Sequence, residues 1–182
     1  MNWANTILVL AAAFLAVFWE AAFSGLRHLL GAQVDLLPAL LVYASLCGSL
    51  GTVCLLALCG GLWFDSLSAN PLGITVLPLF VVGVVIFSAH ELILRDQTFA
   101  QIVLGLAASF IVPVMSLALL LTTGHAPSVG WGTLWQLTVL TVGGGLATPV
   151  CFMLFDWLQR TLVHARKVES SFRADREIRR GR

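Results

Sequence analysis

The chain has 182 residues, of which 59% are hydrophobic and only 10% charged, and its formal net charge is +1. An ordinary soluble domain has roughly a quarter of its residues charged. This composition therefore excludes a soluble domain and predicts an all-α integral membrane protein. The charges are also unevenly placed, because eight of the ten Lys and Arg residues follow Asp156. We therefore expect two parts: an apolar helical bundle over residues 1–159 and a basic tail over residues 160–182.

The apolar part contains six stretches that predict helices, since one crossing needs about 20 apolar residues at about 1.5 Å per residue. No basic region precedes the first stretch, which predicts a retained helix rather than a removable signal peptide. Asn70 followed by Pro71 predicts the start of the fourth helix, because Asn caps helices and Pro fits the first position. The predicted helices cover residues 3–23, 36–47, 50–64, 71–94, 98–121 and 133–158.

The stretch 36–64 forms either one helix or two. As one straight helix its 29 residues would be roughly 43 Å long, well beyond a hydrocarbon core of about 30 Å. Gly48 and Gly51 lie at a natural break. The pattern therefore favours a hairpin of two short helices and six spans in total, with five spans as the alternative.

The basic tail predicts the orientation of the chain, because Lys and Arg close to the end of a span mark the cytoplasmic side. The tail is therefore expected in the cytoplasm. With six spans the N-terminus is cytoplasmic as well, Arg95 lies inside and Arg27 lies outside. With five spans Arg27 also lies inside, so the charges do not decide the number of spans.

Three carboxylates, Glu20, Asp35 and Asp65, are expected near the outer end of a six-span bundle, with Arg27 as the nearby cation. An ionisable group at membrane depth costs roughly 2.5–3.5 kcal/mol, so it usually pairs or lines a wet cavity. Three interpretations stay open: an ion-pair network that closes the bundle, a contact with a partner protein, or a pocket for a ligand or cation.

Two acid–base pairs have the i,i+4 spacing that places both side chains on one helix face. Glu91 with Arg95 and Asp156 with Arg160 are therefore expected to act as interfacial ion pairs. The chain has none of the sequence motifs of zinc proteases, serine hydrolases or P-loop nucleotidases, and its four cysteines lack metal or redox spacing. We expect a non-enzyme with no cofactor and no metal.

The tail has an apolar stripe of Leu158, Leu162, Val168 and Phe172 among its basic residues. A helix that either continues past the membrane or lies on it is therefore expected. The basic residues suit anionic lipid or a cytoplasmic partner, or serve only as the orientation signal. No aromatic platform accompanies the arginines, so nucleic acid is not an expected partner.

Two segments resemble the MreD family of rod-shape-determining membrane proteins. That family has an aspartate at the entry to its second span, as Asp35 is here, and a Leu-Asp-x-x-Ser-Gly-x-Pro-Leu-Gly type segment between its third and fourth spans. The kink Thr148-Pro149 also resembles the family's final span. The residues that match the longer segment are Asp65, Ser68, Pro71, Leu72 and Gly73.

The resemblance implies a non-enzymatic scaffold of the cell-wall elongation machinery in the bacterial inner membrane. Its implied partners are MreC, RodA and a class B penicillin-binding protein, with the MreB filament reached through the tail. Asp65 would accept loop N–H groups, and the residues implied to shape the outer face are Asp35, Asp65, Ser68, Pro71 and Gly73. The architecture is also similar to the substrate-binding subunits of energy-coupling-factor vitamin transporters, and such a subunit is the alternative function.

Overall fold

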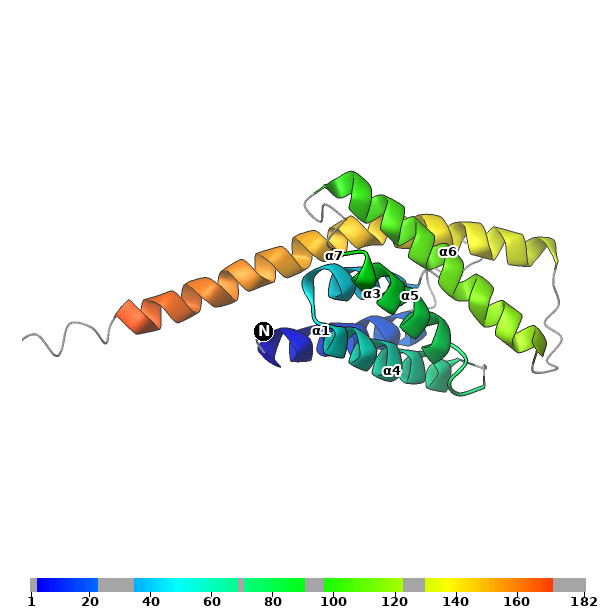
Figure 1. Cartoon of the computed structure of the whole chain (residues 1–182), viewed down its shortest axis with the longest axis horizontal. Coiled ribbons are helices and arrows are strands. Elements are labelled where there is room, and N and C mark those ends of the chain that lie inside the picture. Colours follow the sequence, from blue (N-terminus) through cyan, green and yellow to red (C-terminus); the bar gives the residue numbers. More distant parts are fainter. Residues whose placement is uncertain (1–2, 23–34, 69–70, 91–96, 123–129, 172–182) are drawn as a thin grey trace, which may run out of the picture. The chain divides into compact units, whose positions relative to one another are not determined.

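The computed structural model describes residues 3–22, 35–68, 71–90, 97–122 and 130–171, with the side chains of the last helix described as far as residue 158 and at 161. All the regular structure in these residues is helical. Two compact units meet within the last helix, Met1–Pro149 and Val150–Arg182, and each is described by itself. The helices, shown in Figure 1, are α1 (Trp3–Ala22), α3 (Leu37–Cys47), α4 (Leu50–Leu67), α5 (Val76–Ser88), α6 (Thr98–Thr122) and α7 (Trp131–Ser171).

Four of the described helices are long and apolar enough to cross a membrane, which agrees with the predicted membrane class. α3 and α5 have only 11 and 13 residues, roughly 17 and 20 Å, so they are shorter than the hydrocarbon core. The described part of the chain thus contains six helices, of which four have the length and composition of membrane-spanning helices. Those four are Asn5–Ala22, Leu50–Leu67, Thr98–Thr122 and Trp131–Leu158.

The predicted break between the second and third helices is confirmed. α3 ends at Cys47 and α4 begins at Leu50, with extended backbone at Gly48 and Ser49. The Ser49 hydroxyl accepts a hydrogen bond from the Thr52 N–H at 3.3 Å, which caps the new helix. Two helices in a hairpin thus replace one helix that would be too long for the membrane.

The predicted start of the fourth helix at Pro71 is wrong. Residues 72–75 form turns and α5 begins only at Val76. The backbone N–H groups of Gly73 and Thr75 donate to the Asp65 side chain. Because a carboxylate on the preceding helix binds these groups, the chain stays in a turn for five residues longer than the Pro signal predicts.

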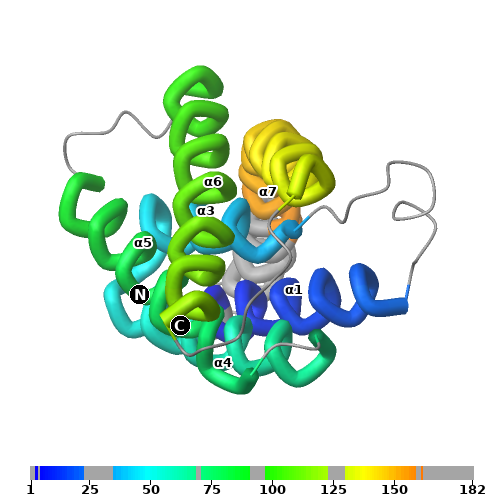
Figure 2. Tube along the Cα trace, turned by 90° about the vertical axis from the view of Figure 1, so that its right-hand side faces the viewer, coloured from blue at the N-terminus to red at the C-terminus, as the bar shows by residue number. Residues whose placement is uncertain are grey.

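α3 is the core of the Met1–Pro149 unit. Ten of its eleven residues are buried. It contacts α1, α4, α5 and α6, and both Figure 1 and Figure 2 show it among these helices. The Ser45 hydroxyl lies at hydrogen-bond distance from the carbonyl oxygens of Leu41 (2.8 Å) and Gly83 (3.2 Å). Gly83 also lies close to α4 and α3, because a Cβ there would lie 2.6 Å from a methyl carbon of Val53 and 3.0 Å from one of Leu41.

The direction of each helix follows from its contacts. α1 and α4 run parallel, because Thr6 pairs with Thr52 at 3.0 Å between hydroxyl oxygens and the Phe14 ring packs edge-on against Trp63 at 5.2 Å between centroids. α3 runs the other way, since Leu37 at its start packs on Gly60 of α4. The C-terminal ends of α1 and α4 therefore lie beside the N-terminal end of α3.

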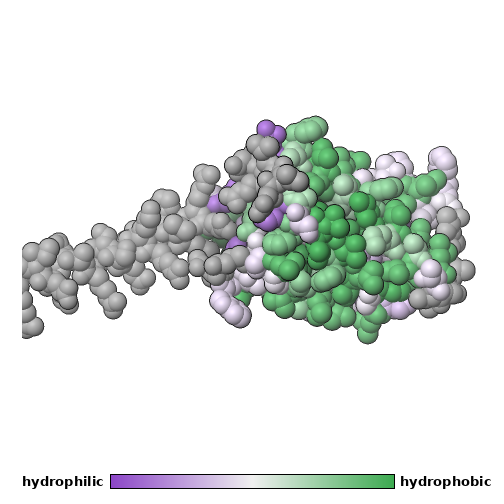
Figure 3. All heavy atoms as spheres, in the orientation of Figure 1, coloured by the Kyte–Doolittle hydropathy of each residue, from purple (hydrophilic) through white to green (hydrophobic). Residues whose placement is uncertain are grey.

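α6 packs against the first part of α7 through small residues. A Cβ on Gly105 would collide with Thr148, and a Cβ on Gly144 would collide with Ser109. Close backbone approach at small residues is a common way for helices to associate in lipid. The outward side chains are largely apolar, and Figure 3 shows hydrophobic residues over most of the described surface on the face it displays.

Candidate functional site

The strongest polar site joins α4 to α5 through one carboxylate. Asp65 is 1% exposed, and its Oδ2 accepts hydrogen bonds from the backbone N–H of Gly73 at 2.8 Å and of Thr75 at 3.1 Å. Its Oδ1 accepts a third hydrogen bond from the Thr75 hydroxyl. We call Asp65, Gly73 and Thr75 the α4–α5 clasp. Three hydrogen bonds to the Asp65 carboxyl thus tie the end of α4 to the turn before α5.

Gly73 is the conformational requirement of the clasp. Its φ is +94°, the one positive φ among the described residues, and L residues with a side chain rarely adopt it. No atom lies within 4 Å of a Cβ built there, so the backbone conformation rather than space demands glycine. The N–H groups on either side of this turn, those of Gly73 and Thr75, both donate to Asp65.

The other residues of the resemblance segment serve the same turn. The Ser68 N–H donates to the carbonyl oxygens of Phe64 (3.0 Å) and Asp65 (3.3 Å), which ends α4. The Pro71 carbonyl accepts a hydrogen bond from the Ile74 N–H at 3.4 Å, and the Pro71 ring is exposed. Ser68 and Pro71 therefore shape the turn around a buried Asp65.

A second polar site caps the N-terminus of α3. Glu20 Oε1, from α1, accepts a hydrogen bond from the Leu36 N–H at 2.6 Å, and Asp35 Oδ1 accepts one from the Leu37 N–H at 2.8 Å. The first N–H groups of a helix have no partner within it and carry partial positive charge. We call Glu20 and Asp35 the α3 cap. Because consecutive N–H groups bind the two carboxyls, these acids lie side by side.

The two carboxyls of the α3 cap are not equally satisfied. Glu20 Oε2 is buried and has no hydrogen-bond partner in the described structure. Asp35 precedes α3, outside the helices, and burial raises the pKa of its carboxyl from 3.8 to about 6, an effect partly opposed by the hydrogen bond from Leu37. The protonated form of Asp35 is thus favoured over the charged form more strongly than in water.

The structure sorts the predicted site residues into two sites rather than one network. Asp65 serves the clasp, whereas Glu20 and Asp35 serve the α3 cap. Asp156 is exposed and Arg160 lies in α7, and their ion pair stays a prediction. Arg27, Glu91 and Arg95 lie outside the described residues.

Thr75 was not among the residues predicted from the sequence. It is buried and donates both its N–H and its hydroxyl to Asp65. A polar residue just before an apolar helix was the available signal, since Thr is common at such positions. The predicted helix over residues 71–94 instead placed Thr75 in a helix interior.

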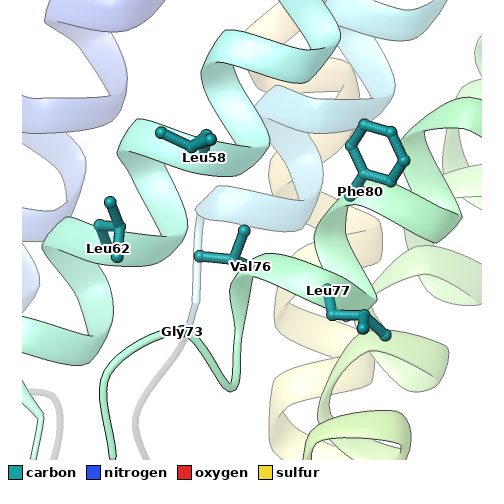
Figure 4. Close-up of a pocket in the computed structure, with 6 residues that line it drawn as sticks. All are labelled: Leu58, Leu62, Gly73, Val76, Leu77 and Phe80. Atoms are coloured by element: carbon teal, nitrogen blue, oxygen red, sulfur yellow. The ribbon is translucent and has the colours of Figure 1, made fainter.

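The clasp borders an apolar groove between α4 and α5, shown in Figure 4. The groove has a volume of about 420 Å³. Its side chains carry no polar group, so it offers contact area to an apolar chain and no hydrogen bond. The residues that line it are Leu58, Leu62, Gly73, Val76, Leu77 and Phe80. Among the described residues, no group of three His, Cys, Asp or Glu side chains is placed to hold a metal.

Comparisons with family models, with curated proteins and with solved structures find no match to this chain. The functional interpretation of the α4–α5 clasp and of the α3 cap is therefore based on their geometry and on the resemblance in the Asp65–Gly73 segment.

Proposed function

We propose that this protein is a non-enzymatic membrane scaffold of the bacterial cell-wall elongation machinery, located in the inner membrane with its tail in the cytoplasm. Its partners are MreC, RodA and a class B penicillin-binding protein, and the tail faces the MreB filament. In this role the bundle presents a fixed outer surface to MreC, and the protein contributes no reaction of its own.

The α4–α5 clasp is the observation that carries this proposal. Asp65 and Gly73, two residues of the segment that resembles the MreD family, are the residues that hold the turn between α4 and α5. The clasp leaves Pro71 and Leu72 exposed, the latter by 71%. A rigid turn that displays apolar residues is suited to protein contact, because little conformational entropy is lost when a partner binds.

The helix faces offer a further contact area. α1 exposes large side chains along its length, and exposed apolar surface in a membrane-spanning helix faces either lipid or another membrane protein. The residues exposed on α1 include Trp3, Ile7, Phe14, Leu15, Phe18 and Trp19. MreC, as a membrane protein, would contact either this face or the clasped turn.

Purification of the tagged full-length protein from its own host in nanodiscs tests the proposal. MreC and the RodA–penicillin-binding-protein pair are expected to be recovered with it. Leu72→Ser changes the exposed tip without touching the clasp and is expected to reduce MreC recovery. Asp156→Asn changes an exposed carboxylate elsewhere and serves as the control. Undiminished MreC recovery with Leu72→Ser and Asp65→Ala would refute the role of this turn.

A substrate-binding subunit of a vitamin transporter is the second candidate, and the α3 cap favours it. Glu20 Oε2 is a buried polar atom without a partner, and a pre-formed ligand pocket uses a few such convergent groups. Recovery of a transmembrane coupling subunit with two ATPases, together with a thermal shift in a vitamin panel, would support this function over the scaffold. The absence of any shift would exclude it.

A further inference from the structure

We draw no further inference here: the strongest candidate, the apolar groove between α4 and α5 that Gly73 of the clasp borders, lies on a face of the bundle for which nothing in the structure shows whether lipid, a partner helix or a second copy of the chain covers it.

Discussion

Asp65 and Thr75 are joined by two hydrogen bonds, one from the Thr75 backbone N–H and one from its hydroxyl. The two residues lie at the end of α4 and immediately before α5, and both are buried. A helix hairpin at a membrane interface leaves backbone groups without partners at each helix end. In this hairpin the Asp65 carboxyl accepts hydrogen bonds from two backbone N–H groups of the turn, those of Gly73 and Thr75.

Removal of the Thr75 hydroxyl is expected to destabilise the protein. Thr75→Val keeps the shape but leaves Asp65 Oδ1 without its donor, which costs about 1–3 kcal/mol for a buried acceptor. Thermal unfolding in a mild detergent measures the change. Thr138→Val removes a hydroxyl from an exposed position of α7 and is expected to change the melting temperature little. A Thr75→Val protein as stable as the parent would show that the clasp contributes nothing to folding.

Gly73→Ala is expected to destabilise the turn by about 1–2 kcal/mol, the cost of placing an L residue at positive φ. A Cβ at Gly73 meets no neighbouring atom, so the loss would come from the backbone alone. Gly132→Ala is the matched control, because its Cβ also meets no atom and its φ is negative. Equal stability of the two variants, measured by the same thermal unfolding, would contradict the assigned role of Gly73.

Asp35 predicts a pH dependence of stability. Because folding raises its pKa from 3.8 to about 6, its favourable contribution is present below about pH 4 and is lost as the pH rises through 6. Asp35→Asn keeps an oxygen acceptor for the Leu37 N–H and stays neutral.

The melting temperature of the Asp35→Asn protein is therefore expected to fall less than that of the parent between pH 4 and pH 7. Asp156→Asn, which removes an exposed carboxylate, controls for the loss of one charge and should retain the parent's slope. Parallel pH profiles for the parent and Asp35→Asn would show that Asp35 does not titrate with folding.

Ser109→Ala is expected to stabilise the protein by about 1 kcal/mol. The Ser109 hydroxyl is buried against Gly144 and has no hydrogen-bond partner in the described structure, and an unsatisfied buried hydroxyl is costly. Ser88→Ala, at an exposed position, is the control. A destabilised Ser109→Ala protein would mean that the hydroxyl has a partner in the membrane.

The helices were predictable from the sequence because apolar stretches and glycine breaks are local signals. The role of Asp65 as an acceptor of loop N–H groups was also predictable and is confirmed. The start of α5 was not, since Pro71 is a helix-start signal that a carboxylate from the preceding helix overrides. The α3 cap could not be predicted either. Glu20 accepts the hydrogen bond from Leu36 across 16 positions of the chain, and no local sequence pattern indicates that contact.

The burial of α3 has a consequence for how the chain enters the membrane. α3 has only 11 residues, and almost none of its surface would contact lipid. Transfer of α3 by itself from the translocation channel into the bilayer is therefore barely favourable. It becomes favourable only when α4 follows and the two can partition together as a hairpin. We therefore expect insertion to stall if synthesis is halted before residue 67, with α3 held by the insertion machinery until its neighbour emerges.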